Sequence, residues 1–312
     1  MIYDLIIIGG GPAGLTASIY ASRHKLSHLV FEAGVIGGQI ATATEVENWP
    51  GDKSVTGMEL AKRLEDHAVS LGMNLQKKII TELKQEKGVF VCSAGNEKFE
   101  AKSLILSTGA MSRKLGISGE DKFLGRGISY CATCDAPFFK DKPVAVIGGG
   151  DSALTEAVYL SDIASKVYII HRRNEFRAQE ANQDKVKNSK KIELVLSSTI
   201  KELKGDRLLK SILVENVTTK ETKELQVEGV FVYVGNTPAS ALAKPLGVEI
   251  DEKSYIKTDL SMRTNVPGVF SAGDITGAAP QAIVASGQGA VAAMSAYKFI
   301  KGFAEGIAVV NR

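Results

Sequence analysis

The stretch Leu5-Ile-Ile-Ile-Gly-Gly-Gly-Pro-Ala-Gly14 decides the fold of this chain. Its first four residues form a continuous apolar run rich in β-branched side chains, which is typical of a buried parallel strand. The glycine-rich turn that follows contains G-x-G-x-x-G. In this pattern Gly9 permits a tight turn, Gly11 lets the backbone approach a pyrophosphate, and Gly14 lets helix and strand pack closely. A helix is expected from Leu15 to about Arg23, with its free N–H groups facing the phosphates.

The residues after this helix support the same interpretation. A second strand is expected from His28 to Phe31, and Glu32 follows it. Glu32 lies 23 residues after Gly9, where an acid accepts hydrogen bonds from the ribose of a dinucleotide. The glycine pattern alone is a weak signal, because a glycine-rich turn without a ligand looks similar. The strand, helix, second strand and acid in this order favour a dinucleotide-binding fold.

The strongest evidence in the sequence is an internal repeat. An offset of 139 residues places Ile8-Gly-Gly-Gly11 on Ile147-Gly-Gly-Gly150 without gaps. A strand is therefore expected from Val144 to Ile147, and Gly148-x-Gly150-x-x-Ala153 is a second phosphate-binding turn that opens a second helix. We therefore predict an α/β chain with two Rossmann-like dinucleotide-binding domains.

The two copies differ at the position that reads the ribose. With the same offset, Glu32 falls on His171, which is followed by Arg172, Arg173 and Arg177. An acid suits an unmodified ribose and repels a 2′-phosphate, whereas arginines pair with that phosphate. The first fold is thus expected to hold a nucleotide with a free ribose, and the second NADPH rather than NADH. The alternative is that these arginines form a solvated basic face.

A pair of cysteines, Cys131 and Cys134, lies shortly before the second glycine-rich turn. In a cytosolic protein a C-x-x-C is more often redox-active or metal-binding than structural. Zinc needs four ligands, so one such pair without a second pair or a nearby histidine is a poor zinc site. Asp135 follows directly and is placed to transfer a proton to or from a thiol. The isolated Cys92 is interpreted as a small buried hydrophobic residue.

The composition is that of an ordinary globular protein. A length of 312 residues suggests about two domains. The net charge of +3, from 38 basic and 35 acidic residues, is too balanced to indicate nucleic acid as a main partner. The N-terminus lacks the pattern of a signal peptide, and no apolar run is long enough to cross a bilayer. The expected location is the cytoplasm.

The C-terminal part is expected to complete one of the two folds. Asn265 to Asp274 is interpreted as a short strand that ends in an acid, and a helix rich in alanine and glycine follows from about Gln281 to Ile300. Asp274 either accepts hydrogen bonds from a polyol or caps the chain locally. The N-terminus of the Gln281 helix is placed to face an electron-poor ring.

Together and in this order, the motifs resemble the low-molecular-weight thioredoxin reductases over essentially the whole chain. The matching pieces are Gly9-x-Gly11-x-x-Gly14, Gly37-Gly-Gln39, Glu45-Val-Glu-Asn-Trp-Pro50, Cys131-Ala-Thr-Cys-Asp135, Gly148-Gly-Gly-Asp-Ser-Ala153, His171-Arg-Arg-x-x-x-Arg177 and Phe270-Ser-Ala-Gly-Asp274. The resemblance implies an FAD-binding domain at 1–113 and 242–312. It also implies an inserted NADPH-binding domain at 114–241 that carries the redox-active cysteines, a homodimer, and a thioredoxin or thioredoxin-like protein as electron acceptor.

The resemblance also assigns the site residues. Those implied for FAD are Gly9, Gly11, Pro12, Ala13, Gly14, Glu32, Gly38, Gln39, Asn48, Thr108, Gly109, Asp274, Gln281 and Ala282. Those implied for NADPH are Gly148, Gly150, Asp151, Ser152, Ala153, His171, Arg172, Arg173 and Arg177. Of the catalytic residues Cys131, Cys134 and Asp135, the resemblance implies that Cys134 faces the flavin and that Cys131 attacks the partner. One departure is Pro280, because relatives commonly carry an arginine there, although proline suits a helix start.

The expected reaction carries electrons from NADPH through FAD and the Cys131–Cys134 disulfide to oxidised thioredoxin. For this, the inserted domain is expected to rotate about hinges near 112–115 and 236–243. The alternative enzyme is a related flavoprotein that takes electrons from ferredoxin or reduces another disulfide, and the arginine set speaks against it. A non-enzymatic redox or nucleotide sensor is a third hypothesis. Phe138 and Phe139 are either docking groups for the partner or core residues.

Overall fold

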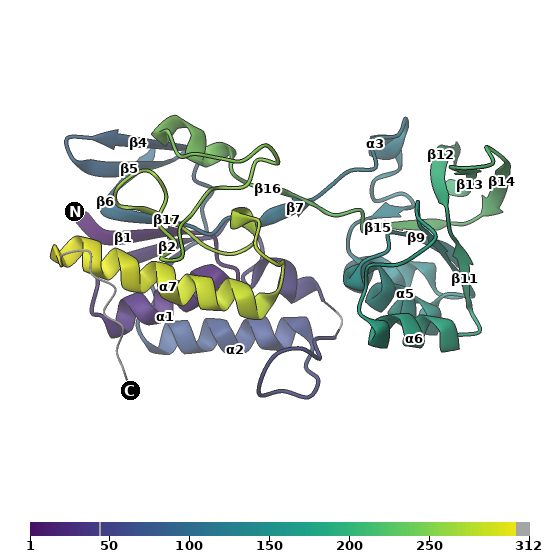
Figure 1. Ribbon diagram of the computed structural model, residues 1–312, viewed down its shortest axis with the longest axis horizontal. Coiled ribbons are helices and arrows are strands. Elements are labelled where there is room, and N and C mark those ends of the chain that lie inside the picture. The colour runs from purple at the N-terminus through teal and green to yellow at the C-terminus, as the bar shows by residue number, and fades with distance from the viewer. Residues whose placement is uncertain (44, 304–312) are drawn as a thin grey trace. The chain divides into compact units, whose positions relative to one another are not determined.

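The computed structural model describes residues 1–43 and 45–303, and it divides into two compact units (Figure 1). The outer unit comprises Met1–Met111 and Thr237–Arg312, and the inserted unit comprises Ser112–Asn236. The strands β7 (Ala110–Ser112) and β16 (Asn236–Pro238) pair with each other where the chain leaves and re-enters the outer unit. Within the described ranges, no helix is both long and apolar enough for a membrane span.

The outer unit is built on a mixed sheet. In spatial order its strands are β3 (Leu75–Gln76), β2 (His28–Phe31), β1 (Ile2–Ile8), β6 (Glu97–Leu106), β5 (Val89–Ala94) and β4 (Glu82–Glu86). The strands β1, β2, β3 and β6 are parallel, whereas β5 pairs antiparallel with both β6 and β4. The strand β17 (Val269–Ser271) pairs in parallel with the last part of β6. The C-terminal segment thus completes the first nucleotide fold, as the sequence predicts.

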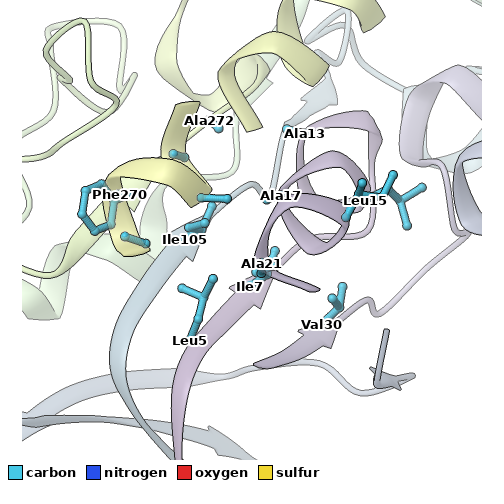
Figure 2. Close-up of a cluster of buried hydrophobic side chains, with 14 of the residues drawn as sticks. Leu5, Ile7, Ala13, Leu15, Ala17, Ala21, Val30, Ile105, Phe270 and Ala272 are labelled. Atoms are coloured by element: carbon cyan, nitrogen blue, oxygen red, sulfur yellow. The ribbon is translucent and has the colours of Figure 1, made fainter. Parts of the chain in front are cut away.

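Helices cover this sheet and bury its core. Figure 1 shows α1 (Pro12–Arg23) between α2 (Gly57–Ser70) and α7 (Ala282–Lys301), and α1 contacts both. Figure 2 shows side chains of β1, β2, β6 and α1 in one cluster, in which Leu5, Ile7 and Leu15 are fully buried. Burying each such side chain contributes about 1.5–3 kcal/mol. Short 3-10 helices complete the unit: η1 (Gly38–Thr42), η3 (Ala241–Leu246) and η4 (Asp274–Thr276).

The inserted unit has a parallel sheet of five strands. In spatial order these are β11 (Ile192–Val195), β10 (Lys166–Ile170), β9 (Pro143–Ile147), β15 (Gly229–Val232) and β8 (Ile128–Ser129). Its longer helices are α5 (Asp151–Ile163) and α6 (Glu180–Asn188), and its short ones are α3 (Glu120–Phe123), α4 (Ala132–Asp135) and η2 (Ala136–Phe139). A separate antiparallel sheet contains β12 (Ser198–Gly205), β13 (Leu209–Asn216) and β14 (Thr222–Gln226).

The internal repeat extends to the pairing register of the strands. Leu5 pairs with His28 in the outer unit, and Val144 pairs with Val167 in the inserted unit, which is the same pair shifted by the repeat offset. The crossover after the second strand is shorter in the inserted unit, so the copies diverge from there. The prediction of two Rossmann-like folds, the second inserted into the first, is confirmed.

Candidate functional site

The first glycine-rich turn is closed toward the sheet and open on its other side. A Cβ on Gly9 would lie 2.1 Å from the Ser107 carbonyl oxygen, and one on Gly14 would lie 1.8 Å from the Gly9 carbonyl oxygen. A Cβ on Gly11 would meet only the Gly37 carbonyl oxygen, at 3.9 Å. The open side lies at the start of α1, whose first residue is Pro12. This is the geometry that accepts a phosphate at a helix N-terminus.

Glu32 is held at the end of β2 by two backbone donors. Its Oε2 accepts from the Gly10 N–H at 2.7 Å, and its Oε1 accepts from the Gly34 N–H at 2.6 Å. A carboxylate has about four lone-pair positions, so two remain for further donors. Glu32 therefore remains able to accept from ribose hydroxyls, which is the role expected of it.

The loop after Glu32 lies against the first turn. The Gly37 N–H donates to the Gly10 carbonyl at 2.8 Å. This bond brings Gly38 to Gly11, where a Cβ on Gly38 would lie 3.4 Å from the Gly11 Cα. The Gln39 side chain donates to the Ala110 carbonyl. The loop thus forms a wall of the same site.

Other residues predicted to bind FAD converge from distant parts of the chain. The Asn48 Nδ2 donates to the Gln281 Oε1 at 2.9 Å, although 233 residues separate the two. Gln281 is the N-cap of α7 and Ala282 is its first residue. Thr108 follows β6 and donates to the Ala239 carbonyl at 2.8 Å, and Gly109 comes next with φ +66°. These residues all belong to the outer unit.

Asp274 is the second acid predicted to bind FAD in the outer unit. It follows β17, and burial raises the pKa of its half-buried carboxyl. This carboxyl has no hydrogen-bond partner among residues 1–43 and 45–303. The preceding Gly273 packs on α1, because a Cβ there would lie 3.1 Å from the Ala13 Cβ. A half-buried carboxylate without a donor fits a polyol hydroxyl, so the residues of this unit fit FAD.

The second glycine-rich turn, in the inserted unit, has the same open shape. A Cβ on Gly150 would have no neighbour within 4 Å, and Ser152 is exposed at the first turn of α5. Ala153 is buried beneath the turn, where its Cβ lies 2.8 Å from the place that a Cβ on Gly148 would take. Asp151 contacts the protein rather than the open side of the turn, because its Oδ1 accepts from Gln179 N and Asn182 Nδ2, both at 2.8 Å.

His171 lies directly beneath this turn. A Cβ on Gly149 would lie 2.5 Å from the His171 ring, so only glycine leaves room for it. The Nε2 donates to the Glu175 carbonyl at 3.1 Å. Burial lowers the pKa of His171, and the arginines nearby lower it further. The imidazole is therefore neutral at pH 7 and acts as a support for the turn rather than as a charge.

The three arginines line a cavity of about 440 Å³ at the end of β10. Glu175, Ser197 and Thr218 also line it. Arg172, Arg173 and Arg177 are exposed, and none of them forms an ion pair within the described part of the chain. Guanidinium groups that are not paired with carboxylates are free to bind a phosphate bidentately.

The cysteine pair forms a disulfide at the start of α4. Cys131 and Cys134 are joined, with their Cα atoms 5.4 Å apart. Ser129 Oγ accepts from the Cys131 N–H at 3.0 Å, which fixes the approach to the turn. Cys131 is half-buried, Cys134 is exposed, and Asp135 is half-buried next to it. The disulfide therefore reaches the surface at Cys134, beside Asp135. The third cysteine, Cys92, is fully buried, and burial raises the pKa of its thiol to about 12.

Sequence reasoning missed Tyr233 as a support of the redox turn. Its hydroxyl accepts from the Ala132 N–H at 3.0 Å, across 101 residues of sequence. Burial raises the pKa of Tyr233, and nearby Glu156 adds to this, so the phenol stays protonated. No local pattern signals this contact, because Tyr233 continues an apolar strand segment.

The two phenylalanines after the turn separate into different environments. Phe139 packs edge-on against Phe231, with ring centroids 5.4 Å apart. Phe138 is 73% exposed. Phe139 is therefore a core residue, and only Phe138 remains as a docking group for a partner.

Two comparisons with known sequences indicate the same family. The sequence pattern of the pyridine nucleotide-disulphide oxidoreductases matches residues 3–289. The thioredoxin reductase of Listeria innocua is 42% identical over 309 residues, which cover 98% of this chain and 96% of that protein.

Solved structures agree with the sequence comparison. The thioredoxin reductase of Lactococcus lactis, in its FR conformation, is 40% identical with a TM-score of 0.94, and the match covers 96% of this chain and 99% of that one. A ferredoxin-flavin thioredoxin reductase of Clostridium acetobutylicum is 32% identical with a TM-score of 0.53, over 96% of this chain and 98% of that one. The likeness thus spans both units.

Proposed function

Because the chain belongs to the pyridine nucleotide-disulphide oxidoreductase family, we propose that it reduces the disulfide of a thioredoxin or thioredoxin-like protein with electrons from NADPH. The observation that carries the proposal is the Cys131–Cys134 disulfide, which is followed in the same unit by a glycine-rich turn with three unpaired arginines at its ribose position. As the family resemblance implies, we expect the enzyme to act as a homodimer.

The outer unit would hold FAD through Glu32, Asp274 and the open turn at Gly11. When bound, FAD would supply two-electron transfer between the nicotinamide and the Cys131–Cys134 disulfide. The inserted unit would hold NADPH with its pyrophosphate over Gly150 and Ser152. Its 2′-phosphate would then lie between Arg172 and Arg177.

The dithiol reduces the partner by thiol–disulfide exchange. The Cys131 thiolate attacks one sulfur of the partner disulfide, which forms an intermolecular S–S bond and breaks the partner's own bond. The released partner sulfur takes a proton. The Cys134 thiolate then attacks Cys131, re-forms the internal disulfide and releases the second partner sulfur, which also takes a proton. Two electrons and two protons thus pass to the partner.

Residues around the turn support these steps. Asp135 adjoins Cys134 and would accept the proton that leaves its thiol. Tyr233 and Ser129 hold the backbone on either side of Cys131, through bonds to the Ala132 N–H and the Cys131 N–H, both at 3.0 Å. Phe138 would offer an apolar contact to the partner close to the disulfide.

One assay tests the proposal against its alternatives. The holoenzyme is mixed with NADPH and oxidised thioredoxin, and the absorbance of NADPH is followed at catalytic and stoichiometric enzyme concentrations. Catalytic NADPH oxidation that Cys134→Ser abolishes is the expected result. A flavin that NADPH fails to reduce would instead support a ferredoxin-dependent enzyme, and a single stoichiometric oxidation would support a sensor.

A further inference from the structure

Glu120 is a buried carboxylate that joins two functional segments of the inserted unit. It is the first residue of α3 and only 4% exposed. Its Oε1 accepts from the Leu115 N–H at 2.8 Å and also from the Tyr130 hydroxyl. Its Oε2 accepts from the Gly116 N–H at 2.8 Å. A buried carboxylate with three donors is well satisfied and holds those donors at fixed positions.

One side of this link is the wall of a pocket. Leu115 belongs to a segment that lines a cavity of about 280 Å³ at the carboxyl ends of β9, β10 and β15. This is where ligands bind to open α/β sheets. Aliphatic side chains of Leu115, Ile117 and Ile200 line the cavity, together with Arg172 and Arg177. Apolar walls beside guanidinium groups fit the adenosine end of a phosphorylated dinucleotide.

The other side of the link is the redox turn. Tyr130 directly precedes Cys131, and its ring packs in the same hydrophobic cluster as Leu115 and Ile117. Burial raises the pKa of the Tyr130 hydroxyl, and its bond to Glu120 raises it further. The phenol therefore stays protonated and continues to donate to the carboxylate throughout the physiological range.

We propose that Glu120 is a positioning residue that couples occupancy of the adenosine pocket to the state of the Cys131–Cys134 turn. The inference rests on the proposed function for its nucleotide. Breaking the disulfide removes the covalent restraint on Cys131, which directly follows Tyr130. Glu120 passes this change to the backbone of Leu115 and Gly116, and Leu115 lines the pocket. The closed turn is thus expected to raise the affinity of the pocket for its ligand. Because binding couplings are reciprocal, an occupied pocket favours the closed turn by the same factor.

The test is a cycle of four proteins that removes the Tyr130 side of the link. The holoenzyme has a closed turn, the double variant Cys131→Ser/Cys134→Ser has an open one, and each is also made with Tyr130→Phe. Affinity for adenosine 2′,5′-bisphosphate is measured by calorimetry, because this probe has no nicotinamide and exchanges no electrons. Tyr130→Phe keeps the packed ring and removes only the hydroxyl.

We expect the closed turn to bind the probe about fivefold more tightly than the open turn, which is the low end of known couplings. Tyr130→Phe should bring the two affinities together. Tyr159→Phe, in α5 and outside the link, should leave the fivefold difference intact.

Equal affinities for closed and open turns, or a difference that survives Tyr130→Phe, would overturn the coupling while the assay with thioredoxin still succeeds. Failure of the probe to bind either form would overturn the nucleotide assignment itself and the coupling with it.

Discussion

Nucleotide selectivity gives the sharpest test of the inserted unit. Arg172 and Arg177 line the same cavity and pair with no carboxylate in the described ranges, so both are available to a 2′-phosphate. A hydrogen bond to a charged group contributes about 1.5–3 kcal/mol, and exposure to solvent places these arginines at the lower end. Since about 1.4 kcal/mol is tenfold in affinity, each substitution to alanine should raise the KM for NADPH about tenfold. The KM for NADH should not change.

The measurement is thioredoxin-coupled oxidation of NADPH and NADH by Arg172→Ala, Arg177→Ala and the double variant. If both arginines contact one phosphate, the double variant should lose less than the two single effects combined. Arg207→Ala, an exposed arginine between β12 and β13, is the matched control and should behave as wild type. A parallel rise in the KM for NADH would refute the reasoning, because it would mean that the arginines support the fold rather than the 2′-phosphate.

Four further changes test other parts of the molecule. Asp135→Asn should slow dithiol turnover with thioredoxin and spare flavin reduction by NADPH in rapid-mixing experiments; equal loss of both would remove Asp135 from proton transfer. Asp274→Asn should weaken FAD retention about tenfold, measured as flavin absorbance per protein. It should also raise the Tm of the flavin-free chain at neutral pH, because burial disfavours the charged carboxylate that the substitution removes. Tyr233→Phe leaves the Ala132 N–H without its partner and should cost about 1–3 kcal/mol of unfolding free energy, whereas unchanged denaturant midpoints would show that water replaces it. Burial lowers the pKa of His28, so on acidification the unfolded chain binds a proton at this histidine before the folded chain does. The stability that neutral His28 provides is therefore lost as the pH falls below about 6.5. The Tm advantage of wild type over His28→Gln should shrink from about pH 7.5 to about pH 5.

The internal repeat made most of the fold predictable from the sequence. Strand pairing follows the offset from Leu5 and His28 to Val144 and Val167, because each copy needs the same apolar strands around its glycine-rich turn. The antiparallel strands β4, β12 and β14 were not recognised as elements in the same way. Their alternating polar faces and short turns resemble surface loops when only one sequence is read.

The site residues also fall into two groups. Some are revealed by a local sequence pattern, and others depend on contacts between segments that are distant in the sequence. The cysteines, Glu32 and the arginines are recognised by type and spacing, and the structure places each at the end of its strand or helix. Glu120 and Tyr233 act through contacts with residues that no spacing rule connects to them. Pro280 lies where the sequence places it, directly before the last helix, because Gln281 is the N-cap of α7.

The pairing of β17 with β6 has a consequence for synthesis on the ribosome. Val269 pairs with Leu104, so the outer unit needs residues from both sides of the insertion before its sheet is complete. The inserted unit is complete once residue 236 has left the exit tunnel. Domains fold as units during synthesis. The inserted unit should therefore fold first, while the face of α1 that packs on α7 stays uncovered until α7 has been synthesised.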